Sequence, residues 1–318
     1  MKTVSISNSR LMKFNIIFII MAQLLLPVTF LLKLWNSSHG SVLEWIGAFY
    51  ITGSYIFFIY ITGAWSWFGN ITRRIWVSLF IFVAVLGFPY GHTSLTEANL
   101  INIDLLLAIL VGSTFIFLSI FVLFGRRFNK PALELTFPLR GGIFVVAQGG
   151  CNQLINHHVT SSSQYYALDL LKINTWGTRA KGLYPRDPSR YAIFGAEVVS
   201  PCDGVVAAVT DGFPDFSPPD RHPEHRAGNF IALEYKGSTI YLAHLQNGSI
   251  YVSANEHVHI GQVLGHVGNS GNTTEPHLHI HAESGHYTGQ FSGQPAVPIR
   301  FNGHFLVRND HVKISGSK

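Results

Sequence analysis

The stretch Glu275-Pro276-His277-Leu278-His279-Ile280-His281 decides how the C-terminal part of this 318-residue chain folds. Apolar and imidazole side chains alternate along it, and this two-residue period predicts a β-strand with the three histidines on one face. Residues 265–272 just before it are rich in Gly, Ser and Asn, which indicates turns and places the histidines where the strand begins. Imidazoles grouped in this way act as metal ligands and bases, so we look for their partners elsewhere in the chain.

The chain beyond Pro131 consists of short β-branched runs separated by Gly, Pro, Asn and Asp, which is typical of an all-β domain. Strands are predicted at residues 143–147, 166–171, 196–199, 204–210, 230–235, 239–244, 262–267 and 277–282. Of the sixteen histidines, fourteen lie beyond residue 150. A catalytic or metal-binding role therefore belongs to this part of the chain.

The first 130 residues contain most of the apolar excess of a chain whose mean hydropathy is +0.26. Four stretches are long and nearly free of charge, as membrane-spanning helices are: 14–32, 45–64, 75–90 and 105–124. The third is the shortest and contains Gly87 and Pro89, so it is the weakest candidate for a crossing. We therefore expect about four transmembrane helices over residues 1–130, a β domain over residues 131–305 and a C-terminal tail over residues 306–318.

Basic residues flank the expected spans unevenly. They lie before the first span, between the second and third, and after the fourth: Lys2, Arg10, Lys13, Arg73, Arg74, Arg126, Arg127 and Lys130. By the positive-inside rule, four crossings place the β domain in the cytoplasm, whereas the opposite face follows if the third stretch does not cross. No basic stripe with interleaved aromatic residues follows residue 140, so we expect a lipid bilayer but no nucleic acid as a partner.

Candidate partners for the strand histidines come from three places in the β domain. Asp169 lies in an otherwise apolar predicted strand, where an unpaired carboxylate would be costly. His157 and His158 lie just upstream, and His244 ends another apolar strand. A catalytic zinc ion needs three ligands from His, Asp or Glu, an open position and a nearby base, and the domain supplies such a set.

Several segments of the β domain resemble the M23 peptidases, the lysostaphin and LytM type of zinc endopeptidase. They are Ser200-Pro201-Cys202-Asp203-Gly204-Val205-Val206, Tyr241-Leu242-Ala243-His244-Leu245, Gly268-Asn269-Ser270-Gly271-Asn272-Thr273 and Pro276-His277-Leu278-His279. The resemblance covers roughly residues 140 to 300 and preserves the family's order of motifs. It implies an antiparallel β-sheet of the LytM type, with a duplicated hybrid motif, and Zn2+ as the cofactor.

The resemblance also implies roles for individual residues. His279 and Asp169 would bind zinc, while His277 and His244 would handle protons and stabilise the tetrahedral intermediate. His281 has no counterpart in the family's pattern. Successive residues on one face of a strand are about 6.6–6.8 Å apart, so three of them rarely share one metal ion, and we expect His281 to support a ligand or to lie at the rim.

The first zinc histidine departs from the family's common HxxxD spacing. The residue four positions before Asp169 is Tyr165. A longer-spaced variant of the family has this histidine in an Asn-x-His context well upstream, and Asn156-His157-His158 matches that context. The resemblance therefore favours His158 over His157 as the remaining ligand.

Two further features have simpler interpretations. Residues 211–228 contain four prolines and several charges, which predicts a long exposed loop in which His222 and His225 are solvated. Cys151 and Cys202 are too few for a disulfide framework, so we expect free buried thiols, with a single disulfide as the alternative.

We therefore expect a multi-pass, membrane-anchored zinc metalloendopeptidase that hydrolyses the peptide cross-links of peptidoglycan in the cell wall. Its substrate would require the outer face of the membrane, whereas the charge bias favours the cytoplasm. One alternative is a non-catalytic M23-like domain that binds or regulates a cell-wall hydrolase. Another is a membrane sensor or transport component, but only Asp104, at the edge of a span, offers charge at membrane depth.

Overall fold

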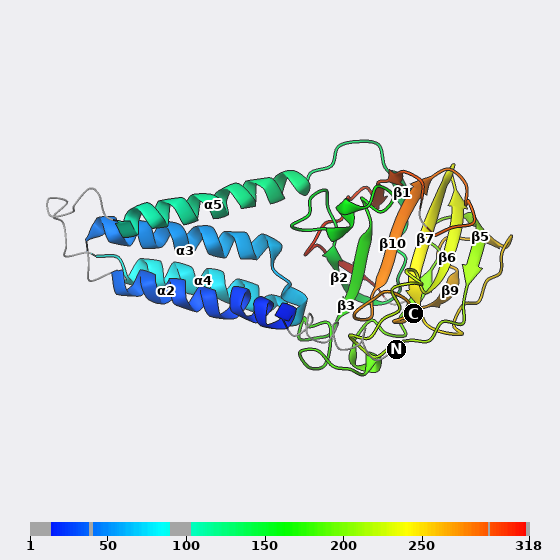
Figure 1. Cartoon of the computed structure of the whole chain (residues 1–318), viewed down its shortest axis with the longest axis horizontal. Helices are drawn as coiled ribbons and strands as arrows, with labels where there is room; N and C mark the ends of the chain where they lie inside the picture. Colours follow the sequence, from blue (N-terminus) through cyan, green and yellow to red (C-terminus); the bar gives the residue numbers. More distant parts are fainter. Residues whose placement is uncertain (1–13, 38–40, 90–102, 292, 316–318) are drawn as a thin grey trace. The chain divides into compact units, whose positions relative to one another are not determined.

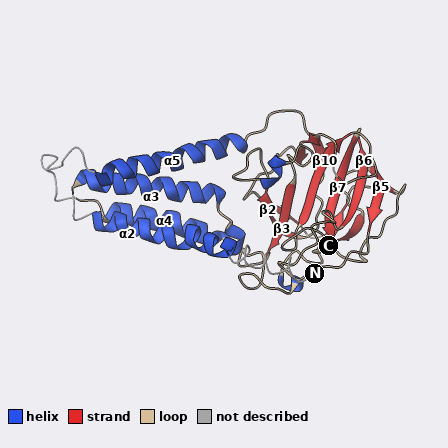
Figure 2. Ribbon diagram, in the orientation of Figure 1, coloured by secondary structure: helices blue, strands red, loops and turns tan. Residues whose placement is uncertain are grey.

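The computed structural model describes residues 14–37, 41–89, 103–291 and 293–315. These residues belong to two compact units, a helical unit within Leu11–Trp65 and Gly69–Phe124 and a β-rich unit made chiefly of Gly125–Lys318. The helices and strands divide between them in the same way (Figure 2).

The helical unit has its long helices side by side (Figure 1). They are α2 (Leu26–Asn36), which continues the short π-helix η1 (Met21–Leu25), α3 (Val42–Thr62), α4 (Asn70–Leu86) and α5 (Ile103–Gly125). Within the described residues, three helices are long and apolar enough to cross a membrane: Phe14–Asn36, Val42–Thr62 and Ile103–Gly125. α4 has 17 residues. At 1.5 Å per residue this gives about 26 Å, less than the roughly 30 Å hydrocarbon core. The helix count thus roughly matches the expectation of about four, but three of the helices, and not α4, are long and apolar enough to cross a membrane.

The β-rich unit is built on one large sheet. The strands are β1 (Leu133–Leu135), β2 (Gly142–Gln148), β3 (Leu168–Ile173), β4 (Glu197–Val199), β5 (Gly204–Thr210), β6 (Asn229–Tyr235), β7 (Ser238–Leu245), β8 (His257–Val258), β9 (Val263–His266), β10 (Leu278–Ser284), β11 (Ala296–Val297), β12 (Ile299–Phe301) and β13 (His311–Ile314). The large sheet has the order β13-β2-β3-β10-β7-β6-β5-β8, with β11 beside β10, and all its pairs are antiparallel. The predicted antiparallel β domain is confirmed.

The centre of this sheet brings distant parts of the sequence together. β10 lies between β3 and β7, so His279 is paired with Asp169 on one side and with Ala243 on the other. His244 follows Ala243 directly. The strand order therefore gathers three of the sequence-predicted site residues at one place.

The two faces of β10 have different surroundings. Leu278 and Ile280 belong to the main hydrophobic core, and burying each such side chain stabilises the fold by roughly 1.5–3 kcal/mol. His279 and His281 alternate with them and share the opposite face. The register is thereby fixed, because a slip of one residue would put the imidazoles into the core.

Some elements differ from expectation. Residues 306–318 were expected to be a tail, yet β13 within them pairs with β2, and Leu306 and Val307 are buried. The strands β1, β8, β11 and β12 were not predicted either, and each has only two or three residues. Both cysteines are free, as expected, with Cys202 buried and Cys151 partly buried.

Candidate functional site

Asp169 lies at the centre of the candidate site. Its Oδ1 atom is 3.0 Å from Nε2 of His158, 3.0 Å from Nδ1 of His279 and 3.5 Å from Nε2 of His277. Asp169 is only 6% exposed and His279 only 3%. One buried carboxylate oxygen is therefore surrounded by three imidazole nitrogens, and two of these belong to residues predicted to bind zinc.

His158 is positioned by a short turn that Asn156 holds in place. The turn is the 3-10 helix η5 (His157–Thr160), and the Asn156 side-chain oxygen accepts the backbone N–H of His158 at 3.1 Å. The Asn156 side chain is fully buried, and its Nδ2 donates to three backbone carbonyls, those of Gly150, Tyr165 and Ala167. The turn is thus tied to the segment leading into β3, which contains Asp169.

The two candidates for the remaining ligand lie side by side. The rings of His157 and His158 have centroids 3.9 Å apart, and both residues form a candidate metal-binding group with Asp169. His158 is the one hydrogen-bonded to Asp169, whereas His157 is more exposed. Tyr165, at the family's usual histidine position, donates its hydroxyl to the carbonyl of Cys151 at 3.0 Å.

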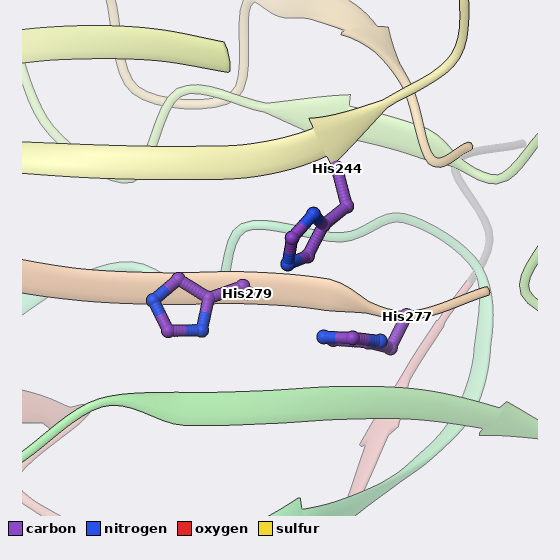
Figure 3. A group of neighbouring side chains, drawn as sticks. All are labelled: His244, His277 and His279. Carbon is purple, nitrogen blue, oxygen red and sulfur yellow. The ribbon is translucent and has the colours of Figure 1, made fainter. Parts of the chain in front are cut away.

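His244 and His277 face the same region from β7 and from the start of β10 (Figure 3). Their ring centroids are 4.7 Å apart. Nδ1 of His244 lies 2.9 Å from the carbonyl oxygen of Ser270, and Nδ1 of His277 lies 2.9 Å from that of Glu275. Since a carbonyl only accepts, Nδ1 is the donor in both rings, and a neutral ring then has its lone pair on Nε2.

Burial and charge set the protonation states of the site. Burial, reinforced by His277, lowers the pKa of His244 to about 3. Burial likewise holds the pKa of His279 well below its usual range. Burial alone would raise the pKa of Asp169, but the charges of His158 and His277 and the hydrogen bonds from His158 and His279 hold it well below its usual range. Asp169 is therefore ionised and His244 and His279 are neutral, which are the states in which a carboxylate and an imidazole bind a metal ion. Burial lowers the pKa of His158, but the charge of Asp169 and its hydrogen bond raise it overall, so a metal ion would have to displace a proton from this ring.

The set of donor atoms fits a catalytic zinc ion. His158, Asp169 and His279 supply two imidazole nitrogens and one carboxylate, and catalytic zinc sites use three such ligands with one position left open. Two groups have ligand atoms that all lie within 4.8 Å of one another: His157, His158 and Asp169 form one, and His244, His277 and His279 form the other. The set predicted from the sequence takes His158 and Asp169 from the first group and His279 from the second. The alternative set of His244, His277 and His279 therefore overlaps with it at His279.

A cavity of about 410 Å³ borders the site, and part of its lining was not anticipated from the sequence. Arg221 and Asn272 line it together with Asp169 and His277, and Arg226 lines a neighbouring cavity with His279. Arg221 and Arg226 belong to the segment 211–228, which was expected to be an exposed loop. The segment is only partly exposed, and it contributes positive charge beside the candidate metal site.

Asp215 fixes this segment beside the site. Its two carboxylate oxygens accept the backbone N–H groups of Asn269 and Asn247, at 2.6 and 3.1 Å. An acidic residue among prolines was the signal that could have indicated such an anchor. The ring centroids of His222 and His225 lie 4.6 Å apart with the planes tilted by 36°, and neither residue joins a candidate metal-binding group among the residues the structure describes.

His281 is more buried than a rim position would be. It is 1% exposed, and its Nδ1 lies 3.0 Å from Nε2 of His279. Its own Nε2 lies 3.3 Å from Oε1 of Glu283, a buried acid that the sequence did not single out. His281 therefore contacts the predicted ligand His279 through the ring nitrogen that does not face Asp169.

Solved structures similar to this chain include three peptidases. A putative peptidase M23 from Pseudomonas aeruginosa is 20% identical over 52% of this chain and 53% of its own, with a TM-score of 0.28. A zinc-containing peptidase from Vibrio cholerae is 21% identical over 41% and 50%, with a TM-score of 0.24. The M23 metalloprotease pseudoalterin, of deep-sea origin, is 14% identical over 57% and 99%, with a TM-score of 0.34. This chain spans about half the length of the first two.

Residues 190–290 match the sequence model of Peptidase family M23. The matched segment contains His244, His277 and His279, whereas His158 and Asp169 precede it. The M23 resemblance seen in the sequence is thus confirmed over residues 190–290.

Proposed function

We propose that the β-rich unit is a zinc metalloendopeptidase in which His158, Asp169 and His279 hold the metal ion. The observation that supports this most strongly is the position of Asp169, whose buried Oδ1 is 3.0 Å from a ring nitrogen of each of the two histidines. Two imidazoles and a carboxylate converge in the same way in catalytic zinc sites with two histidines and one acidic ligand. The family match, which includes His279, points to the same chemistry.

The catalytic residues in this proposal are His244 and His277. A zinc ion, when bound, would polarise a peptide carbonyl and lower the pKa of a water molecule. Both histidines keep Nδ1 occupied by a backbone carbonyl, so each presents Nε2 as a base that takes up a proton and returns it to the leaving amine. Positioned acid–base groups of this kind typically contribute about 10²–10⁴-fold to a rate.

The proposed substrate is the peptide cross-link of peptidoglycan. The M23 match supports a peptide substrate, and the apolar helices support a place at the membrane, next to the cell wall. The two arginines that line the cavities beside the site suit a peptide that bears carboxylates.

The proposed location of the β-rich unit is the outer face of the membrane. Three helices are long and apolar enough to cross, and an odd number of crossings separates the basic N-terminal segment from the β-rich unit. By the positive-inside rule, the basic residues after α5 instead favour the cytoplasmic face. One of them, Arg126, forms an ion pair with Asp310 at 2.8 Å inside the β-rich unit, which gives it a structural reason to be basic.

Hydrolysis by ligand variants tests the proposal. We expect the full-length chain in detergent to cleave cross-linked peptidoglycan fragments, and Asp169→Ala and His279→Ala each to lose zinc and cleavage together. His286→Ala is the matched control, because His286 pairs with Glu234 at an exposed position. Full cleavage by either ligand variant refutes the ligand assignment. A wild-type chain that binds the fragments without cleaving them supports the non-catalytic alternative.

A further inference from the structure

We propose that His281 and Glu283 are positioning residues for the metal ligand His279, and that they select the tautomer in which Nδ1 of His279 is free to bind the metal. This inference rests on the zinc function proposed above. It assigns a role to a buried histidine and a buried acid that the proposed reaction does not itself use.

The three side chains form a continuous chain along one face of β10. Nε2 of His279 lies 3.0 Å from Nδ1 of His281, and Nε2 of His281 lies 3.3 Å from Oε1 of Glu283. All three residues are at most 3% exposed, so water does not compete for these contacts. The two-residue period of the strand places them next to one another.

The direction of the hydrogen bonds follows from Glu283. Its Oε1 also accepts the backbone N–H of Gly293 at 3.2 Å, and its Oε2 accepts that of Gln294 at 3.1 Å. Both oxygens therefore act as acceptors, and Nε2 of His281 must be the donor. A neutral imidazole has one ring proton, so Nδ1 of His281 accepts the Nε2–H of His279.

The consequence for His279 is that its Nδ1 has no proton and presents a lone pair. This nitrogen lies 3.0 Å from Oδ1 of Asp169, which is itself an acceptor. Two acceptor atoms this close repel each other unless a cation lies between them, whereas in the other tautomer Nδ1–H of His279 donates to Asp169. The chain from Glu283 thus removes the proton that would compete with the metal at Nδ1, as partners of metal-bound histidines generally do.

Aromatic neighbours keep the connecting ring in place. The Tyr241 ring is stacked on His281 with centroids 4.7 Å apart and planes inclined by 10°. Phe291 meets His281 edge-on at 5.3 Å. The ring plane of His281, and with it the direction of both hydrogen bonds, is therefore restricted.

Zinc affinity tests this role. We would measure it by competition with a chromophoric chelator, on the full-length chain in detergent. His281→Phe keeps an aromatic ring against Tyr241 but removes the acceptor, and we expect about 10–100-fold weaker zinc binding. His281→Asn restores an acceptor near the Nδ1 position, so its affinity should lie between those of wild type and His281→Phe.

The matched control is His286→Phe, the same change at an exposed His–Glu pair, and its affinity should equal that of wild type. Should His281→Phe fail to fold by circular dichroism, Glu283→Gln decides, with weaker binding again expected. Wild-type affinity in a folded His281→Phe or in Glu283→Gln overturns the inference, and the proposed function survives provided that Asp169→Ala still loses zinc. A wild-type chain that binds no zinc overturns both.

Discussion

His244 combines a strained backbone with a catalytic position. Its φ is 65°, in the left-handed region that residues other than Gly, Asn and Asp rarely adopt. Asn tolerates this conformation, so His244→Asn removes the imidazole with little strain at the backbone. We expect kcat to fall by about 10²–10⁴-fold, because the variant lacks an acid–base group, while bound zinc stays at the wild-type level. Steady-state kinetics and metal analysis of the same preparation measure kcat and bound zinc.

The amount of zinc bound by His244→Asn decides between the two overlapping ligand sets. Loss of zinc in His244→Asn would show that His244, His277 and His279 hold the ion, since their ligand atoms also lie within 4.8 Å of one another. Retention of zinc together with retention of kcat would instead mean that His244 is neither a ligand nor an acid–base group.

At the scale of elements, the turn that contains His158 depends on one buried amide. Asn156→Ala removes the acceptor for the His158 N–H and leaves three backbone carbonyls, in two buried hydrogen bonds and one partly buried one, without this donor. Each buried group left unpaired costs about 1–3 kcal/mol, so we expect the free energy of unfolding to fall by at least that amount. Zinc affinity should fall as well, because the turn positions a ligand. Urea unfolding and chelator competition measure the two effects.

Thr160→Val is the control for that turn. Thr160 ends the same short helix, and its hydroxyl donates to the nearby carbonyl of His157 at an exposed position. We therefore expect Thr160→Val to change the free energy of unfolding by no more than about 0.5 kcal/mol. Equal stability and zinc affinity in Asn156→Ala and Thr160→Val would contradict the positioning role of Asn156.

The sequence could predict those elements whose structure is determined by local residues. The strands β5, β7 and β10 have an internal alternation or β-branched run, and each was predicted to within two residues at either end. β13 depends on pairing with β2, which lies far away in the sequence, so local residues give little sign of it.

The same distinction applies to the site. His277, His279 and Asp169 stand out locally, as imidazoles on an alternating strand and as an acid in an apolar run. Arg221 does not, because its relation to the site arises only when the segment 211–228 packs beside it. Glu283 continues the alternation of β10 but lies just beyond the predicted end of the strand at residue 282. The pairing of His279 with Asp169 is a matter of register between strands more than 100 residues apart, which no local pattern encodes.

At the scale of the whole molecule, the number of crossings determines the compartment of the β-rich unit. A reporter active only after export, fused to the C-terminus, should be active, because three crossings place that end outside. A reporter active only in the cytoplasm is the matched control, and it should be inactive when fused to the same C-terminus. The reverse pattern would mean that α4 also crosses and that the β-rich unit cannot reach cross-linked peptidoglycan.

Zinc dependence is the most direct test of the central claim, that His158, Asp169 and His279 form the metal centre of a peptidase. We would strip the full-length chain with a chelator, remove the chelator and add zinc back in measured amounts while following peptide cleavage. Cleavage should be abolished by stripping and should return in proportion to zinc, levelling at one ion per chain. Cleavage that persists in the stripped protein, or that zinc does not restore, would contradict the claim.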